Sequence, residues 1–297
     1  MASVIEKLGQ GRVLVSDGAW GTLLHQRGLK PGECPELWNA THREDVLAIA
    51  NSYIDAGADI ILTNSFGGSP EKLRHYGLET RAYELNKAAA EISREAAGDD
   101  RLVLGSIGPT GIILMMGQVT EDTLSQGFRI QAEALIDGGV DAVCIETMSA
   151  IDEACCAIRA VKSVTGLDVI CTFTFEKMHD GSFRTMMGVS VGEMVTAVLE
   201  AGADIIGTNC GNGFENMIDI VSEIRTIDRE TPVLVHANAG MPVLENNESV
   251  FPETPEMMAA RVPDLIQSGA NIIGGCCGTT PEHIRLIAGQ IRLWNEK

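Results

Sequence analysis

A short pattern that recurs four times along the chain limits the fold more than any other feature of the sequence. In each copy a helix-like stretch ends at a glycine, an Asp or Asn follows, and a short apolar run comes next. The copies are AGADIILTN (56–64), GGVDAVCIE (138–146), AGADIIGTNC (201–210) and SGANIIGGCC (268–277). Glycine suits the left-handed position that ends many helices, and an unbroken apolar run suits a strand buried on both faces of a parallel sheet. The pattern therefore predicts an α/β fold with parallel strands.

Four further apolar runs lie between these copies and bring the number of predicted strands to eight. They are VLVSD (13–17), LVLGS (102–106), DVICTF (168–173) and PVLVH (232–236). Amphipathic helical stretches separate successive strands, and eight such units in 297 residues predict a (β/α)8 TIM barrel. A doubly wound open sheet is the alternative. Because the units repeat without a break in composition, we favour the barrel and expect residues 1–297 to form a single domain.

Several of the predicted helices have recognisable first residues. THRE from Thr41 and SVGE from Ser190 have the spacing of a capping box. Thr254 and Thr280 are each followed by a proline, which is favoured at the first helical position. We therefore expect helices to begin at these four positions.

The charge and hydropathy of the chain exclude two classes of partner. The formal net charge is −19, so a polyanion such as nucleic acid would be repelled. No apolar run reaches the roughly 18 residues of a membrane span, and the first residues lack the pattern of a signal peptide. We therefore expect a cytoplasmic protein that acts on a small molecule. In that reducing compartment the eight cysteines are expected to be thiols.

Polar or metal-binding residues stand where the predicted strands end. They are Asp17, Asn64, Ser106, Glu146, Thr172, Asn209, Cys210, Asn238, Cys276 and Cys277. In (β/α)8 barrels the active site lies at the C-terminal ends of the strands, so these residues are expected to surround one mouth. Two glycine-rich turns, SDGAWGT (16–22) and GSIGPTG (105–111), follow the first and third strands. They are either substrate-binding loops or plain tight turns.

Three of the cysteines are expected to share one metal ion. Cys210 ends the sixth predicted strand, and Cys276 and Cys277 end the eighth, so a barrel brings the three thiols to the same rim. Three protein ligands with an open fourth position describe a catalytic zinc site, and sulfur ligands favour Zn²⁺ over Mg²⁺ or Ca²⁺. The alternative is that these are small buried residues, because free Cys is among the most buried residue types.

The remaining cysteines carry no such signal. Four of them fall within predicted strands or a helix and are interpreted as core residues: Cys144, Cys155, Cys156 and Cys171. The sequence does not decide the place of Cys34.

The motifs at the strand ends resemble those of a known family. DGAWGT, TNSF, GSIGPTG, IET, GTNCG, ANAG and GGCCGTTPEHI occur in the order found in the homocysteine S-methyltransferase family and span nearly the whole chain. Within the family the chain is most similar to the homocysteine-binding module of cobalamin-dependent methionine synthase, chiefly through GSIGPTG and GGCCGTTPEH. It is less similar to the betaine- and S-methylmethionine-dependent members. The Cys…Cys-Cys pattern is the specific part of the resemblance, since glycine-rich pieces are common.

The resemblance implies a fold and a cofactor. The family is a (β/α)8 barrel that binds Zn²⁺ through three cysteines, which correspond here to Cys210, Cys276 and Cys277. Asn238, in ANAG, matches a residue associated with the fourth zinc position when substrate is absent.

The resemblance also implies substrate contacts. Asp17 and Glu146 match acidic positions that hold the amino group of homocysteine in the family. Ser106, Asn209 and Asn238 also stand at strand ends, and we predict that they contact the substrate.

The expected activity is zinc-dependent methyl transfer to a thiol, with homocysteine as the first candidate. A free thiol has a pKa of about 8.5, and coordination to a cation removes its proton, so a zinc thiolate would be the nucleophile. Full-length cobalamin-dependent synthases continue with further modules, whereas this chain ends at Lys297. A corrinoid protein or module that carries methylcobalamin is therefore an expected partner and methyl donor. Betaine and S-methylmethionine are the alternative donors.

Other functions fit parts of the same pattern. A corrinoid-linked demethylase that acts on another thiol or methylated substrate would use the same residues. An aldolase- or lyase-like barrel with incidental cysteines would need a catalytic Lys or His at a strand end, and no strand-end Lys is found. A zinc- or thiol-binding module without catalysis is the third alternative.

Overall fold

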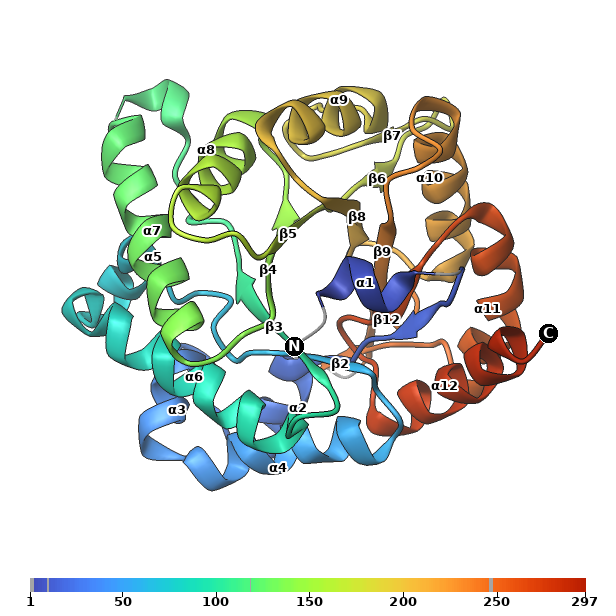
Figure 1. The fold of residues 1–297 in the computed structure, drawn as a ribbon, viewed down its shortest axis with the longest axis horizontal. Coiled ribbons are helices and arrows are strands. Elements are labelled where there is room, and N and C mark those ends of the chain that lie inside the picture. Colours follow the sequence, from blue (N-terminus) through green and yellow to red (C-terminus); the bar gives the residue numbers. More distant parts are fainter. Residues whose placement is uncertain (1–2, 10, 118, 246–247) are drawn as a thin grey trace.

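Eight parallel strands form the centre of the molecule, in the order β1-β12-β9-β8-β5-β4-β3-β2 (Figure 1). The computed structural model describes residues 3–9, 11–117, 119–245 and 248–297. The barrel strands are β1 (Leu14–Val15), β2 (Ile60–Leu62), β3 (Leu102–Ile107), β4 (Ala142–Met148), β5 (Asp168–Phe173), β8 (Ile205–Asn209), β9 (Val233–Ala237) and β12 (Ile272–Gly275). A parallel bridge between Ser16 and Ile60 joins β1 to β2 and closes the sheet. The predicted (β/α)8 barrel is confirmed, and the open sheet is wrong.

Helices surround the barrel on its outer side (Figure 1). The main helices are α2 (Trp20–Gln26), α4 (Arg43–Asp55), α6 (Ala82–Ala97), α7 (Glu121–Asp137), α8 (Ile151–Lys162), α9 (Val191–Ala201), α10 (Phe214–Ile227), α11 (Pro255–Ser268) and α12 (Pro281–Asn295). Shorter ones are α1 (Val4–Leu8), α3 (Trp38–Thr41), α5 (Pro70–Leu73), η1 (Pro35–Leu37), η2 (Arg74–Tyr76), η3 (Glu79–Arg81) and η4 (Leu114–Met116). Two antiparallel hairpins, β6 (Glu176–Lys177) with β7 (Phe183–Arg184) and β10 (Val243–Glu245) with β11 (Glu248–Val250), follow β5 and β9. None of the described helices combines the length and hydropathy needed to cross a bilayer.

Three of the four predicted helix starts are confirmed. Ser190 and Glu193 form a capping box at α9, and Thr254 and Thr280 are the N-caps of α11 and α12 with a proline next to each. The prediction at Thr41 is wrong. Its hydroxyl donates to the carbonyl of the preceding turn at a distance of 3.1 Å, so Thr41 ends α3 instead of capping α4.

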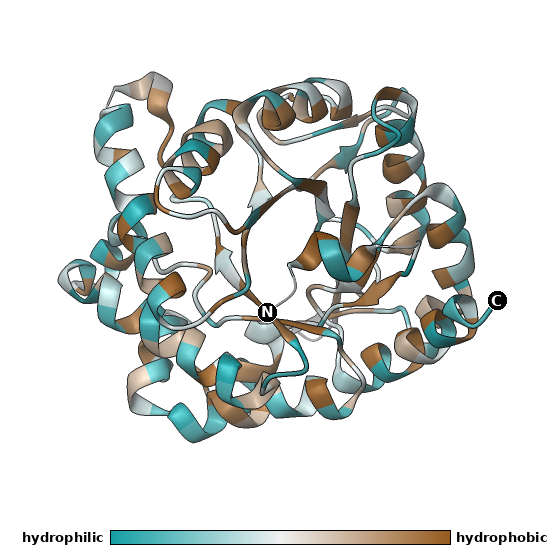
Figure 2. Cartoon of the chain, in the orientation of Figure 1, coloured by the Kyte–Doolittle hydropathy of each residue, from teal (hydrophilic) through white to brown (hydrophobic). Residues whose placement is uncertain are grey.

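The barrel interior is filled by one apolar cluster to which every barrel strand contributes. Val4 and Leu8 of α1 belong to the same cluster, so this short helix covers the N-terminal end of the barrel, as the view in Figure 1 shows. A second, larger cluster lies between the strands and the outer helices, and Figure 2 shows hydrophobic residues concentrated along the strands. The four cysteines predicted to be core residues are buried and free, and Cys34 is buried as well.

The Asp or Asn of the repeated pattern links neighbouring strands at the N-terminal end of the barrel. In each copy its side chain accepts a hydrogen bond from a backbone N–H of the adjacent strand. The bonds are Val15 to Asp59, Val103 to Asp141, Val169 to Asp204 and Val233 to Asn271, at 3.0, 2.7, 2.7 and 2.8 Å. The repeat therefore encodes the stagger between pairs of strands as well as the strands themselves.

Candidate functional site

Three cysteine thiols meet at the C-terminal mouth of the barrel. Cys210 follows β8, Cys276 and Cys277 follow β12, and β9 lies between these two strands. The three Sγ atoms all lie within 4.8 Å of one another, and those of Cys210 and Cys277 are 4.0 Å apart. Tetrahedral Zn–S bonds of about 2.3 Å place sulfurs about 3.8 Å apart, so the thiols are spaced for one shared ion. Across the described residues no other group of three His, Cys, Asp or Glu side chains converges in this way.

Strand β9, which lies between β8 and β12, holds the backbone of Cys210 on one side and of Cys276 on the other. The N–H of Cys210 donates to the carbonyl of His236 at 2.9 Å, and the N–H of Cys276 donates to the carbonyl of Ala237 at 2.7 Å. Cys210 has a φ of 59°, in the left-handed region that non-glycine residues rarely adopt. Such strain persists only where the surroundings hold it, and here it turns the thiol toward those of β12.

The electrostatics of the cluster suit a divalent cation. Hydrogen bonds from the thiols of Cys276 and Cys277 lower the pKa of Cys210, and the bonds to Cys210 raise the pKa of both partners. Cys210 is therefore the most acidic of the three thiols, and a bound cation would favour the deprotonated form of all three. Asn238 lies beside Cys210, and its buried Oδ1 has no partner among the described groups. Three sulfurs with a nearby free oxygen fit the ligand set of Zn²⁺.

Asp17 is the first of two carboxylates buried beside the thiols. Its Oδ2 accepts hydrogen bonds from the indole N–H of Trp20 and from the backbone N–H of Leu62, both at 2.8 Å. Burial raises the pKa of Asp17 to about 7, and these bonds offset the shift only in part. No Lys or Arg of the described chain forms an ion pair with it. The carboxyl group therefore has room for a cationic ligand.

Glu146 is the second carboxylate and comes from β4. The hydroxyl of Ser106 donates to its Oε1. Burial raises the pKa of Glu146 to about 7, and the neighbouring negative charges of Asp17 and Cys210 add to the shift. A positively charged group bound between the two carboxylates would relieve this repulsion.

The side chain of Asn209 is occupied by protein groups. Its Oδ1 accepts from the N–H of Thr147 at 2.8 Å and from the hydroxyl of Thr172 at 2.7 Å, and its Nδ2 donates to Oγ1 of Thr147 at 2.7 Å. Thr147, with a φ of 60°, is the other left-handed non-glycine residue of the described chain. These contacts give Asn209 a positioning role at the strained strand ends, and its predicted contact with substrate stays a prediction.

One cavity of ≈ 280 Å³ collects most of the predicted site residues. The predicted residues that line it are Asp17, Asn64, Ser106, Glu146, Cys210, Cys276 and Cys277. Asn209 and Asn238 are not among its lining residues. A larger hollow of ≈ 920 Å³ lies at the other end of the barrel, lined by charged residues such as Arg12, Asp59 and Arg101, and no thiol lines it. Volume alone therefore does not identify the site, whereas the converging ligand atoms do.

Several lining residues of the cavity lie outside the sequence prediction, and three of them carry an indole or ionisable side chain: Trp20, Glu36 and His236. Trp20 lies in the glycine-rich turn DGAWGT, which the sequence indicates as a possible substrate-binding loop. Glu36 is buried in η1, where the N–H of Gly67 donates to it at 2.7 Å, and no local pattern indicates that it reaches the mouth. His236 is the polar last residue of the predicted apolar strand PVLVH, and this position at a strand end could have indicated that it lies at the site.

The fold and the site together define a TIM-barrel protein with a three-cysteine metal centre. The sequence profile described as "Homocysteine S-methyltransferase" matches residues 14–291. The chain belongs to the homocysteine S-methyltransferase family. The aldolase- or lyase-like alternative treats the cysteines as incidental, whereas three of them converge at the described cavity, and no Lys lines it.

Two related sequences are much longer than this chain. It is 31% identical over 313 residues to the methionine synthase of Mycobacterium leprae (strain TN), an alignment that covers 99% of this chain and 25% of that protein. It is 32% identical over 302 residues to the methionine synthase of Mycobacterium tuberculosis (strain ATCC 25618 / H37Rv), covering 94% of this chain and 25% of that protein. The chain thus spans about a quarter of the length of these relatives.

A solved structure supports the fold. The metallated form of the homocysteine methyltransferase MmuM from Escherichia coli superposes with a TM-score of 0.78 at 24% sequence identity, and the match covers 96% of this chain and 98% of MmuM. The two chains share the barrel over almost their entire lengths.

Proposed function

We propose that this chain is a zinc-dependent S-methyltransferase that methylates the sulfur of homocysteine. The observation that carries the proposal is the meeting, in one cavity, of three thiols and two carboxylates that lack a cationic partner among the described residues. The thiols supply metal ligands, and the carboxylates supply a site for an ammonium group. Homocysteine carries a thiol and an ammonium group on one short chain, which matches both halves of the cavity.

Cys210, Cys276 and Cys277 would hold the zinc ion. When bound there, Zn²⁺ supplies a Lewis acid that keeps a coordinated thiol deprotonated near neutral pH. The chain itself fixes the ligand geometry, because β9 carbonyls hold the N–H groups of Cys210 and Cys276.

Asp17 and Glu146 would bind the ammonium group of the substrate. The N–H groups of Trp20 and Leu62 both bond Oδ2 of Asp17, and Ser106 bonds Oε1 of Glu146, so we assign Oδ1 and Oε2 to the ligand. Charge-assisted hydrogen bonds of this type are about twice as strong as neutral ones. A bound ammonium would lower the pKa of both carboxyl groups and hold them ionised.

The methyl group would arrive from the open side of the mouth. Cys277 is exposed there, so a sulfur seated beside the thiols can face a donor in solution. The substrate sulfur would attack the methyl carbon, an S–C bond would form, and the donor would keep the electron pair of its broken bond to the methyl group. No side chain of the chain needs to carry the methyl group in this scheme.

We further propose that the methyl donor is a corrinoid carried by a protein or module. The loops that follow β3, β5 and β9 hold strongly exposed apolar side chains around the mouth: Met116, Met186, Met241 and Leu244, which are exposed by 66%, 78%, 56% and 74%. Exposed apolar groups that gather on one face mark sites of protein contact. A macromolecular donor would cover them when it delivers the methyl group, whereas betaine or S-methylmethionine would leave them in water.

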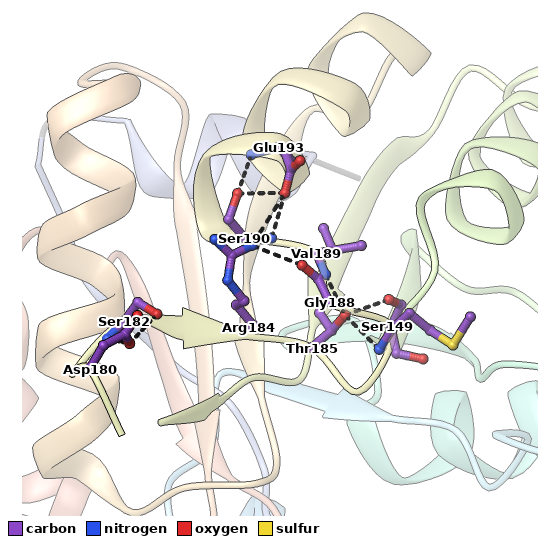
Figure 3. A network of polar contacts seen from close by, with 10 residues as sticks. Ser149, Asp180, Ser182, Arg184, Thr185, Gly188, Val189, Ser190 and Glu193 are labelled. Carbon is purple, nitrogen blue, oxygen red and sulfur yellow. Dashed lines mark hydrogen bonds and ion pairs between the residues drawn. The ribbon is translucent and has the colours of Figure 1, made fainter. Parts of the chain in front are cut away.

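The loop that carries Met186 is held in a fixed shape. Figure 3 shows the hydroxyl of Thr185 donating to the carbonyl of Ser149 at 2.7 Å while it accepts from the N–H of Val189 at 3.2 Å. Arg184 donates to the carbonyl of Gly188 at 2.9 Å. An ordered loop loses little entropy when a partner binds, which favours a docking role.

We also propose that residues 1–297 fold as one domain in a reducing, cytoplasmic environment. One closed barrel accounts for the described helices and strands, and all eight cysteines are free thiols. A single cooperative unfolding transition, followed by circular dichroism and by tryptophan fluorescence, is the expected result. Two separated transitions would contradict the single domain.

The central test is a donor panel with zinc-loaded protein and homocysteine. The donors are a methylated corrinoid protein, free methylcobalamin, S-methylmethionine and betaine, and the product measured is methionine. We expect zinc-dependent methionine formation that is fastest with the corrinoid protein. Failure with every donor would overturn the proposed function, and equal rates with the small donors would overturn the macromolecular donor.

A matched pair of variants tests the docking face. Met186→Lys should slow transfer from the corrinoid protein and leave transfer from free methylcobalamin unchanged. Leu293→Lys, which changes a residue that is 58% exposed near the end of α12, should leave both rates unchanged. Equal rates in the two variants would remove the docking role of the loop.

A further inference from the structure

His236 lies at the floor of the candidate substrate cavity without any described hydrogen-bond partner for its ring. It follows Leu234 by two residues in β9, and Leu234 belongs to the interior cluster, so the imidazole points into the barrel. The residue is 2% exposed and lines the same cavity as Asp17 and Cys276. Its Nε2 is fully buried and unpartnered among the described groups.

An unsatisfied ring nitrogen at such a depth needs an explanation. A buried polar group without a hydrogen bond costs roughly 1–3 kcal/mol, and most buried polar groups in native proteins have a partner. A neutral imidazole has one nitrogen that accepts a hydrogen bond and one that donates.

The neighbouring strand leaves space for the ring. Gly274 pairs with His236 in the sheet, and a Cβ at Gly274 would lie 3.0 Å from Cδ2 of His236 and 2.6 Å from the carbonyl oxygen of Asp17. It would also lie 2.8 Å from Cβ of Ser16. The missing side chain therefore lets the imidazole lie directly beside the backbone of Asp17.

The charge of the cavity indicates which part of a ligand reaches this corner. The cavity is lined by the carboxylates of Asp17, Glu36 and Glu146, and no Lys or Arg lines it. A cationic group is attracted to the acidic end, and an ammonium group has three N–H donors. If Asp17 and Glu146 each accept one of these bonds, the third N–H needs another acceptor, and Nε2 of His236 is the cavity-lining atom that is buried without a partner among the described residues.

We propose that His236 contacts the substrate and accepts the third hydrogen bond of its ammonium group. The inference rests on the proposed function and extends it with a specificity residue outside the metal centre. The ring completes a set of three acceptors with Asp17 and Glu146, so the cavity recognises a primary ammonium on a thiol substrate. The backbone carbonyl of His236 separately positions Cys210 and would survive a change of the side chain.

Three thiols that differ by one group test this inference on zinc-loaded protein by calorimetric titration. Homocysteine carries both head groups, 3-amino-1-propanethiol lacks the carboxylate, and 4-mercaptobutanoate lacks the ammonium. His236→Leu should weaken the two ammonium-bearing thiols at least about 10-fold and 4-mercaptobutanoate less than about 2-fold, as expected for a hydrogen bond to a charged group. His236→Gln retains an acceptor and should restore most of the affinity. Equal weakening of all three thiols, or weakening confined to 4-mercaptobutanoate, would overturn the proposal.

Thr208→Val is a matched control. Thr208 lies on the adjacent strand β8, and its buried hydroxyl is also unpartnered among the described groups, but it does not line the cavity. The variant should keep wild-type affinity for all three thiols. A change in thiol selectivity equal to that of His236→Leu would show that the effect arises from buried polar side chains of the barrel strands in general.

A measurement on the unmodified side chain covers the case in which His236→Leu does not fold. In protein labelled with ¹⁵N-histidine, the ring signals of His236, assigned by their absence in His236→Gln, should shift with 3-amino-1-propanethiol and stay in place with 4-mercaptobutanoate. Unmoved signals in the presence of bound 3-amino-1-propanethiol would overturn the contact. If the wild type binds zinc but not homocysteine, the proposed function fails instead.

Discussion

Acidic side chains at the two ends of the barrel differ in whether they have a cationic partner. At the N-terminal end each Asp of the repeated pattern has a cationic partner and also accepts a backbone hydrogen bond. The pairs are Asp59 with Arg101 at 3.1 Å, Asp141 with Arg94, and Asp204 with Lys162. At the C-terminal end Asp17 and Glu146 are more deeply buried than Asp59 and Asp204 and pair with no described cation.

The difference shows how one residue type serves two purposes in one fold. A carboxylate that is neutralised by Arg or Lys and bonded to a neighbouring strand stabilises strand positions. A carboxylate buried without a cation has a raised pKa and an unfavourable charge, which a cationic ligand can relieve. Stability is therefore concentrated at one end of this barrel and ligand chemistry at the other.

The loss of one thiol from the C-terminal end should have the largest effect on function. Cys276→Ala leaves two sulfurs, so we expect loss of stoichiometric zinc and a fall in methyl transfer of at least about 100-fold. Zinc by elemental analysis and methionine formation are the measurements. Cys155→Ala, on α8 and outside the cavity, is the control and should retain both. Full zinc content in Cys276→Ala would contradict the ligand assignment.

The stability of the substrate-free protein should fall with rising pH because of Asp17. Its pKa is about 7 in the fold and 3.8 as the reference value, so its favourable contribution is complete below pH 3.8 and is lost as the pH rises through about 7. We expect the free energy of unfolding to drop by about 4 kcal/mol from this group over that window. Urea titrations of the wild type and of Asp17→Asn measure the difference. Identical pH profiles would show that Asp17 is ionised in the folded protein.

Neutral replacements of the two carboxylates should weaken substrate binding. Asp17→Asn and Glu146→Gln should each reduce homocysteine affinity about 10- to 100-fold, because each removes a charge-assisted hydrogen bond to ammonium. Calorimetric titration with homocysteine and with 4-mercaptobutanoate checks this. The affinity for 4-mercaptobutanoate, which has no ammonium group, should not fall. A matching loss for both ligands would assign the carboxylates a structural role.

A change at the N-terminal end should affect stability and spare binding. Asp204→Ala leaves the N–H of Val169 without its acceptor and Lys162 without its partner, so the free energy of unfolding should decrease by about 2 kcal/mol. Asp204→Asn retains an acceptor, as Asn271 does in the fourth copy, and should lose less than half as much. Urea unfolding and homocysteine titration are the two measurements. Weaker homocysteine binding in Asp204→Ala would contradict the assignment of stability to the N-terminal end and ligand binding to the C-terminal end.

The smallest effect is expected from an exposed charge of the same end. Arg12 is 3.8 Å from Asp59, its side chain is 58% exposed, and Asp59 also pairs with Arg101. Arg12→Ala should therefore change the free energy of unfolding by less than about 0.5 kcal/mol. Chemical denaturation is sufficient to test this. A loss comparable to that of Asp204→Ala would mean that Asp59 depends on Arg12 rather than on Arg101.

Local patterns in the sequence were sufficient for the strands and for the metal-binding thiols. The apolar runs were long and bounded by glycine, and the Cys-Cys pair stood at a strand end where thiols have few other uses. The helix start at Thr41 was wrong because the hydroxyl of Thr41 bonds within the preceding turn. His236 and Glu36 were missed because their positions at the cavity depend on strands and loops that are distant in the sequence.

The sequence alone determined the periodic frame of this protein: eight apolar strands, the helices between them, and three cysteines placed where such strands end. Those features depend on contacts within a few residues, which hydropathy and glycine spacing record directly. Only the tertiary structure decided that Asp59 and Asp204 link neighbouring strands, whereas Asp17 lies beside the thiols without a cationic partner among the described residues. It also decided that the side chain of Asn209 is hydrogen-bonded to Thr147 and Thr172. Burial and partners far along the chain decide whether a side chain is ionised and which of its hydrogen-bonding atoms stay unpaired. That burial and those partners exist only after the barrel has closed.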